Sequence, residues 1–190
     1  MQAGDAMALE STFRTLTVQI RKLSDTLNAI LLTVGDRPQN RGTALADGLE
    51  NSILDLMGSL SGAETAARTA QRAVGATRDL DRARRALAKC QEHFHATEQQ
   101  FAKELVSYES LKQLASLGSE RGGEWKHWAA SMKDAIEQGR QPIEHVSQAL
   151  ALCWHELAEH SGSTSISIRS RNLGQKIFAR TTQEAGDPIG

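Results

Sequence analysis

Two histidines near residue 160 stand close enough together to suggest a metal site. His155 and His160 enclose Glu156 and Glu159, so the segment has the residue types that bind zinc. A zinc-binding helix places its two histidines four residues apart, so that both lie on one face. These two are five apart, which separates them by about 140° around a helix. We therefore expect a solvated helix end here, with His160 near the negative end of the helix dipole.

A second cluster surrounds residue 92. Glu92 and His95 match the Glu-x-x-His element of bundles that bind two iron ions, and Cys90 and His93 lie beside them. Such a site needs further glutamates that project into the core. The apolar seams of the expected helices carry no such glutamates, and Phe94 holds the core position between the two histidines. We therefore expect no metal site and no cofactor.

Arginine and histidine at a spacing of Arg-x(4–6)-His are the pair that acts on the RNA phosphodiester in the all-α HEPN ribonucleases. Two segments match this spacing, Arg121 to His127 and Arg140 to His145. With 15 arginines and six histidines in 190 residues, one or two matches are expected by chance. Arg140 and His145 stand at an expected helix start, and they remain the candidate catalytic pair of an alternative HEPN-like ribonuclease.

The two cysteines and the lack of long apolar runs indicate the compartment. Cys90 and Cys153 both fall on apolar seams, so we expect reduced core residues, which are among the most buried residue types. No run approaches the roughly 20 apolar residues of a membrane span. The first residues also lack the basic and apolar regions of a secretory signal. We expect a cytoplasmic protein that does not bind membranes.

Apolar residues that alternate at spacings of four and three predict long helices. Helices are expected over 9–34, 43–74, 77–117, 124–138 and 142–160. The first seam is Leu9, Phe13, Leu16, Ile20, Leu23, Leu27, Ile30 and Val34. The fold class is therefore all-α, an elongated antiparallel bundle of four to five helices with coiled-coil-like seams. The domain division is a flexible N-terminus over 1–8, a helical bundle over 9–160 and a linker and docking tail over 161–190.

Two helix boundaries stay open at this point. Gly58 and Gly62 either break the second helix or let a partner helix approach closely, and we favour one continuous helix. Gly75 is a weak boundary between the second and third helices. In the third helix, Leu87 and Ala115 belong to one seam that repeats every seven residues.

The formal net charge of −1 hides a strongly basic segment. Residues 68–89 hold seven basic and two acidic side chains, whereas residues 1–67 and 90–160 are both net acidic. The segment has no interleaved aromatic residues on which bases could stack. Its arginines could still contact phosphates, so nucleic-acid binding is the alternative function. The residues that would carry it are Arg78, Arg82, Arg84 and Arg85.

The last 30 residues differ from the rest in composition. Residues 161–167 are rich in Ser, Gly and Thr, and residues 165–170 alternate polar and apolar side chains as a short strand does. An apolar and basic set follows, which suits docking to a partner's sheet or groove. The partner-binding candidates are Ile166, Ile168, Arg169, Arg171, Leu173, Ile177 and Phe178.

These patterns predict a non-enzymatic interaction protein, which acts as an adaptor, a regulatory subunit or an assembly subunit. It would bind a protein partner through the bundle surface and the tail. Self-association into a homo-oligomer is a further possibility, because an apolar seam can be filled by a second chain. A nucleic-acid-associated helical subunit or a HEPN-like ribonuclease is the alternative.

Overall fold

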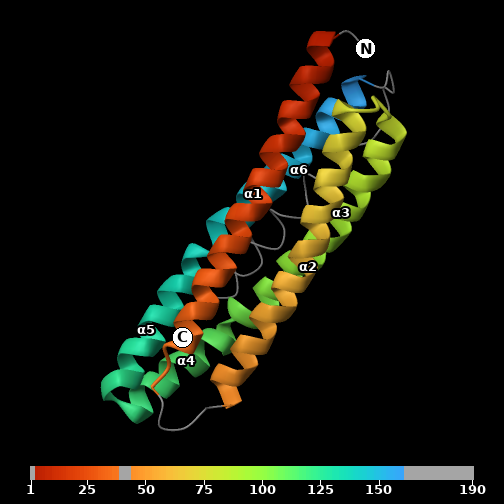
Figure 1. Ribbon diagram of the computed structural model, residues 1–190. Helices are drawn as coiled ribbons and strands as arrows, with labels where there is room; N and C mark the ends of the chain where they lie inside the picture. Colours follow the sequence, from red (N-terminus) through yellow and green to blue (C-terminus); the bar gives the residue numbers. More distant parts are fainter. Residues whose placement is uncertain (1–2, 39–43, 161–190) are drawn as a thin grey trace, which may run out of the picture.

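Four antiparallel rods of helix make up the molecule, which we describe from a computed structural model (Figure 1). The structure describes residues 3–38 and 44–160. The first two rods are α1 (Ala3–Gly35) and α2 (Ala44–Gly75). The third rod comprises α3 (Leu80–Gln100), the π-helical turn η1 (Phe101–Leu105) and α4 (Tyr108–Arg121). The fourth comprises α5 (Gly123–Gln138) and α6 (Arg140–His160), and the described residues contain no strand.

Helix α1 packs against α2, α5 and α6. All eight residues of its predicted seam are buried, with no side chain more than 1% exposed. Each buried Leu or Ile contributes about 1.5–3 kcal/mol by its removal from water. The all-α bundle and this seam are therefore confirmed, and the seam is filled within one chain. The helix also begins earlier than predicted, because residues 3–8, which we expected to be flexible, are helical.

Helix α2 is continuous through both of its glycines, as predicted. A Cβ atom added at Gly62 would lie 2.9 Å from the His93 ring of α3, whereas Gly58 has open space. Gly62 therefore lets α3 approach closely, and the helix does not break there. A turn over residues 76–79 separates α2 from α3, and Asp79 caps α3 by accepting a hydrogen bond from the Arg82 backbone N–H at 2.9 Å.

The prediction of one helix over 77–117 is wrong. The Val106 N–H bonds to the Phe101 carbonyl at 3.2 Å, which makes a π turn, and the helix then stops. Ser107 starts α4 as its N-cap, since its hydroxyl accepts from the Ser110 N–H at 3.2 Å. The new helix has a different phase, so Leu114 is buried and Ala115, which we placed in the seam, is exposed.

The break in the third rod lies against a break in the fourth rod. Gly139 lies between α5 and α6, and a Cβ atom added there would be 2.7 Å from Cζ of the buried Phe101 ring. Pro142 stands in the first turn of α6, where its missing N–H has no intrahelical partner to lose. The six α-helices of the described residues thus exceed the four to five predicted, because the third rod is divided. The break in the fourth rod was predicted by separate helices over 124–138 and 142–160.

Alanine substitutions at Gly139 and Gly58 test the close packing of Phe101 on Gly139. We expect Gly139→Ala to lower the free energy of unfolding by about 1–3 kcal/mol, because the added methyl group collides with Phe101. Gly58→Ala is the matched control, because its methyl group meets open space on a helix, and it should raise the free energy of unfolding by up to about 1 kcal/mol. Urea unfolding followed by circular dichroism measures both, and equal effects at the two glycines would contradict this close packing.

Candidate functional site

The register of α1 against α2 decides which side chains meet between them. Arg21 of α1 bonds to Glu64 of α2, and the Glu10 carboxylate lies over Gly75, within 2.9 Å of where a Cβ atom would stand. Both pairs have residue numbers that add to 85, as expected for two straight antiparallel helices in one register. The same register places Arg14 opposite residues 71–72.

A surface groove of about 360 Å³ lies between the two helices along this stretch. We name it the arginine groove, and its lining residues are Arg14, Thr17, Val18, Arg21, Arg68, Gln71 and Arg72. Arg14 and Arg21 are seven residues apart and lie about 10 Å apart along α1. Arg68 and Arg72 are four apart on α2, which puts both on one face of that helix. Four arginine side chains therefore line this open groove.

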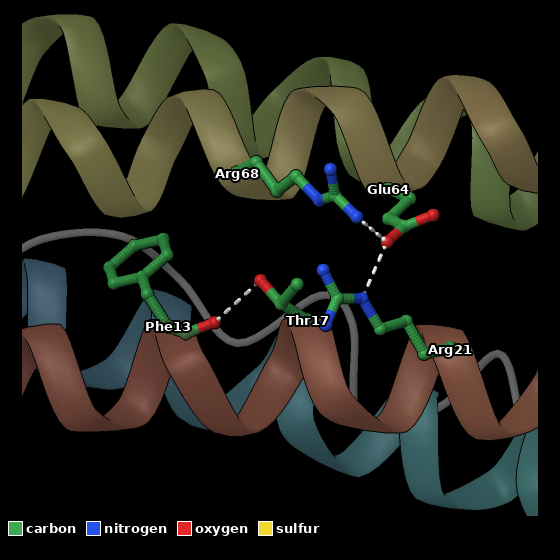
Figure 2. Close-up of polar contacts among 5 residues, drawn as sticks. All are labelled: Phe13, Thr17, Arg21, Glu64 and Arg68. Carbon is green, nitrogen blue, oxygen red and sulfur yellow. Dashed lines mark hydrogen bonds and ion pairs between the residues drawn. The ribbon is translucent and has the colours of Figure 1, made fainter.

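One carboxylate holds two of these arginines. Arg21 Nε donates to Glu64 Oε1 at 2.8 Å, and Arg68 Nη2 donates to the same oxygen at 2.5 Å (Figure 2). The hydrogen bond from Arg21 and then that from Arg68 lower the pKa of Glu64, although partial burial opposes them. Glu64 therefore stays ionised at neutral pH. The Thr17 hydroxyl donates to the Phe13 carbonyl at 3.1 Å and does not bond to Glu64.

The other two arginines, Arg14 and Arg72, make fewer or longer ion pairs. Arg14 pairs with Glu10 at 3.5 Å on the exposed surface of α1. The Arg72 side chain makes no hydrogen bond or ion pair with the residues that the structure describes. Four arginines against Glu10 and Glu64 leave two positive charges in excess. The groove can therefore bind an anion, because guanidinium groups pair with carboxylates and phosphates through several N–H donors at once.

The candidate catalytic pair lies in the first two turns of α6. Arg140 and His145 are five residues apart on α6 and lie about 140° apart around it. Arg140 is also engaged by Glu137, with Nε 2.9 Å from Oε2. No hydrogen bond or ion pair joins Arg140 to His145 in the described part of the chain, and a ribonuclease role for the pair stays a prediction.

The four arginines of the nucleic-acid alternative lie at and after the turn between α2 and α3. Arg78 has a positive φ of 51° in that turn and is exposed. Arg82 and Arg85 are exposed on α3, and Arg84 is half-buried. None of the four lines the arginine groove. The two other arginines of the same basic segment, Arg68 and Arg72, are the ones that enter the arginine groove.

The histidine clusters have local partners. His155 pairs with Glu159 at 3.3 Å, and His160 Nδ1 is 2.7 Å from the Glu156 carbonyl oxygen. His95 lies 3.6 Å from Glu98 on the same helix. Within residues 3–38 and 44–160, no three His, Cys, Asp or Glu side chains are grouped to hold a metal ion. The tail candidates Ile166, Ile168, Arg169, Arg171, Leu173, Ile177 and Phe178 lie outside the described residues.

Sequence reasoning missed half of the groove. Arg14 and Arg21 belong to the net acidic segment 1–67, so counting charge along the chain hid them. Their spacing of seven on a helix was the available signal, since it puts both on nearly one face. Trp128 also has a role that spacing did not show. Trp128 Nε1 donates at 2.9 Å to the Thr33 carbonyl, one of the last four of α1, which lack partners within that helix.

The fold and the groove define a class: an all-α bundle of antiparallel rods with a basic groove between its first two helices. Comparison with protein-family models, with curated proteins and with solved structures finds no match for the chain. None of the described helices has a stretch that is both long and apolar enough to span a bilayer.

The two cysteines give a prediction that tests their burial. Burial raises the pKa of each thiol to about 12, and for Cys153 the neighbouring Cys90 and Glu156 add to the increase. We expect both thiols to react slowly with iodoacetamide at mildly alkaline pH in the native protein and at the ordinary rate in urea. Above a pH of about 8.5 the unfolded chain loses thiol protons and the native chain keeps them, so the free energy of unfolding should fall. Mass spectrometry of the alkylated protein measures the rates, and equal rates in both states would contradict the burial.

Proposed function

We propose that the protein is a non-enzymatic helical-bundle interaction protein that binds an acidic segment of a protein partner in the arginine groove. The observation that supports it is the groove itself, with four arginines and an excess of two positive charges between α1 and α2. An adaptor, a regulatory subunit or an assembly subunit needs such a charged recognition surface on a rigid support. Here the support is the buried seam of α1 and its packing on α2.

Charge complementarity gives the groove its specificity in this proposal. A partner segment with two or more carboxylates or phosphates would balance the excess charge, and attraction would also speed the encounter. Arg72 has no competing partner among the described residues, so it is the first contact available to the segment. The tail of residues 161–190 would add a second contact, because its apolar and basic composition suits docking.

A pair of double variants tests the groove. We expect Arg68→Ala/Arg72→Ala to weaken binding of a fluorescein-labelled hexaglutamate peptide about tenfold, since two exposed ion pairs of about 0.7 kcal/mol each are lost together. The control, Arg82→Ala/Arg85→Ala, removes two charges from the same basic segment but none from the groove, and should bind within about twofold of wild type. Fluorescence anisotropy measures both.

The same assay distinguishes the proposed binding of an acidic protein segment from the alternative, nucleic-acid binding. Equal losses in the two double variants would refute a site in the groove. A single-stranded oligonucleotide that binds more tightly than hexaglutamate, and that depends on Arg82 and Arg85, would favour the nucleic-acid-associated subunit. Circular dichroism of each variant checks that the bundle is intact.

The tail requires a separate experiment on a natural partner. We expect a chain without residues 161–190 to keep the helical circular-dichroism signal of the bundle but to lose a partner that the whole chain retains from native lysate. The lysate is treated with nuclease, so that bridging nucleic acid is removed. Undiminished capture by the shortened chain would refute the tail's part in binding and would leave the groove as the site.

A further inference from the structure

Glu64 lies at one end of the arginine groove, bonded to two of its lining residues. Its Oε1 atom accepts from both Arg21 and Arg68, one from each wall (Figure 2). Its side chain is 24% exposed, whereas those of Arg21 and Arg68 are 56% and 45% exposed. Each arginine thus gives one of its five N–H donors to Glu64, and a ligand anion that takes these two donors must displace the carboxylate.

We propose that the arginine groove is a phosphate-monoester site, in which a phosphorylated side chain of the partner displaces Glu64 from Arg21 and Arg68. This inference rests on the proposed function, because it names the chemistry of the acidic segment. Arg72 and Arg14, at the other end of the groove, complete the contacts to the phosphate or to its acidic neighbours.

The presence of Glu64 favours a phosphate over a carboxylate. An incoming carboxylate would replace one singly charged group by another, so the two arginines would gain nothing in charge. A phosphate monoester carries a charge of about −1.5 to −2 and three acceptor oxygens. It can accept from both arginines at once and still balance part of the excess charge. A phosphate therefore competes with Glu64 for Arg21 and Arg68 more effectively than a carboxylate does.

The lining also favours a protein ligand over a nucleic acid. A phosphodiester carries one charge per phosphate, so it meets the same obstacle as a carboxylate. No aromatic side chain lines the groove to stack on a base. Glu10, over Gly75, and Glu64 lie at the two ends of the α1–α2 stretch that holds the four arginines. A long polyanion that continued along the helices would meet these carboxylates, whereas a compact phosphate fits between them.

The experiment uses the full chain and three labelled peptides that are identical except for a central serine, glutamate or phosphoserine. We expect the phosphoserine peptide to bind about tenfold more tightly than the glutamate peptide. Glu64→Gln removes the competing charge at nearly unchanged shape and should tighten binding of the phosphoserine peptide about fivefold. Glu137→Gln is the matched control, because it breaks an exposed ion pair with Arg140 on other helices, and it should leave the affinity unchanged.

Each contrary outcome has its own meaning. Equal affinity for the glutamate and phosphoserine peptides would overturn the phosphate site and leave an acidic-segment site standing. Unchanged affinity in Glu64→Gln would show that the ligand does not displace Glu64, and would overturn the inference as well. Competition by inorganic phosphate at concentrations near the peptide's Kd would assign the groove to free phosphate instead of a partner protein. No binding of any acidic peptide would refute the proposed function itself.

Discussion

The burial of one stripe of α1 is the constraint on which the rest of the molecule depends. Three helices, α2, α5 and α6, pack around this stripe, and every residue in it is excluded from water. The stripe also fixes the register of α2, which two contacts along the pair record: Glu10 over Gly75, and Arg21 with Glu64 at 2.8 Å. The arginine groove is therefore a consequence of helix register and not of a loop. Its geometry is as rigid as the packing that sets it.

The two divided rods show how the bundle accommodates a change of phase. At the π turn the third rod turns Phe101 toward Gly139, the residue at which the fourth rod is also broken. After the π turn along the chain, α4 packs mainly against α5 and does not continue along α2. The indole of Trp128 bonds to the last turn of α1 through the Thr33 carbonyl and so fastens α5 to the undivided pair. The undivided rods, α1 and α2, are the ones that carry the groove.

The parts of the fold that sequence predicted are those in which one period runs through a whole helix. The seams of α1 and α2 continue without interruption, so spacing alone named their buried residues. Spacing failed after Phe101, where the helix makes a π turn and the Phe101 ring lies against Gly139, because this neighbour is 38 residues away along the chain. It failed again at Trp128, whose hydrogen bond to Thr33 crosses 95 residues. A periodic pattern records which face is buried, but it does not record which partner fills it.

The charge of the arginine groove also depends on which helices pair. Segment 1–67 is acidic as a whole, but Arg14 and Arg21 lie on the face of α1 that meets the basic end of α2. Their charges act together only after α1 and α2 have paired. Exposed ion pairs such as Arg21 with Glu64 contribute only about 0–1 kcal/mol, so the bundle does not need them for its stability. Because the apolar seam holds the helices together, ligand binding can rearrange these charges without loosening the fold.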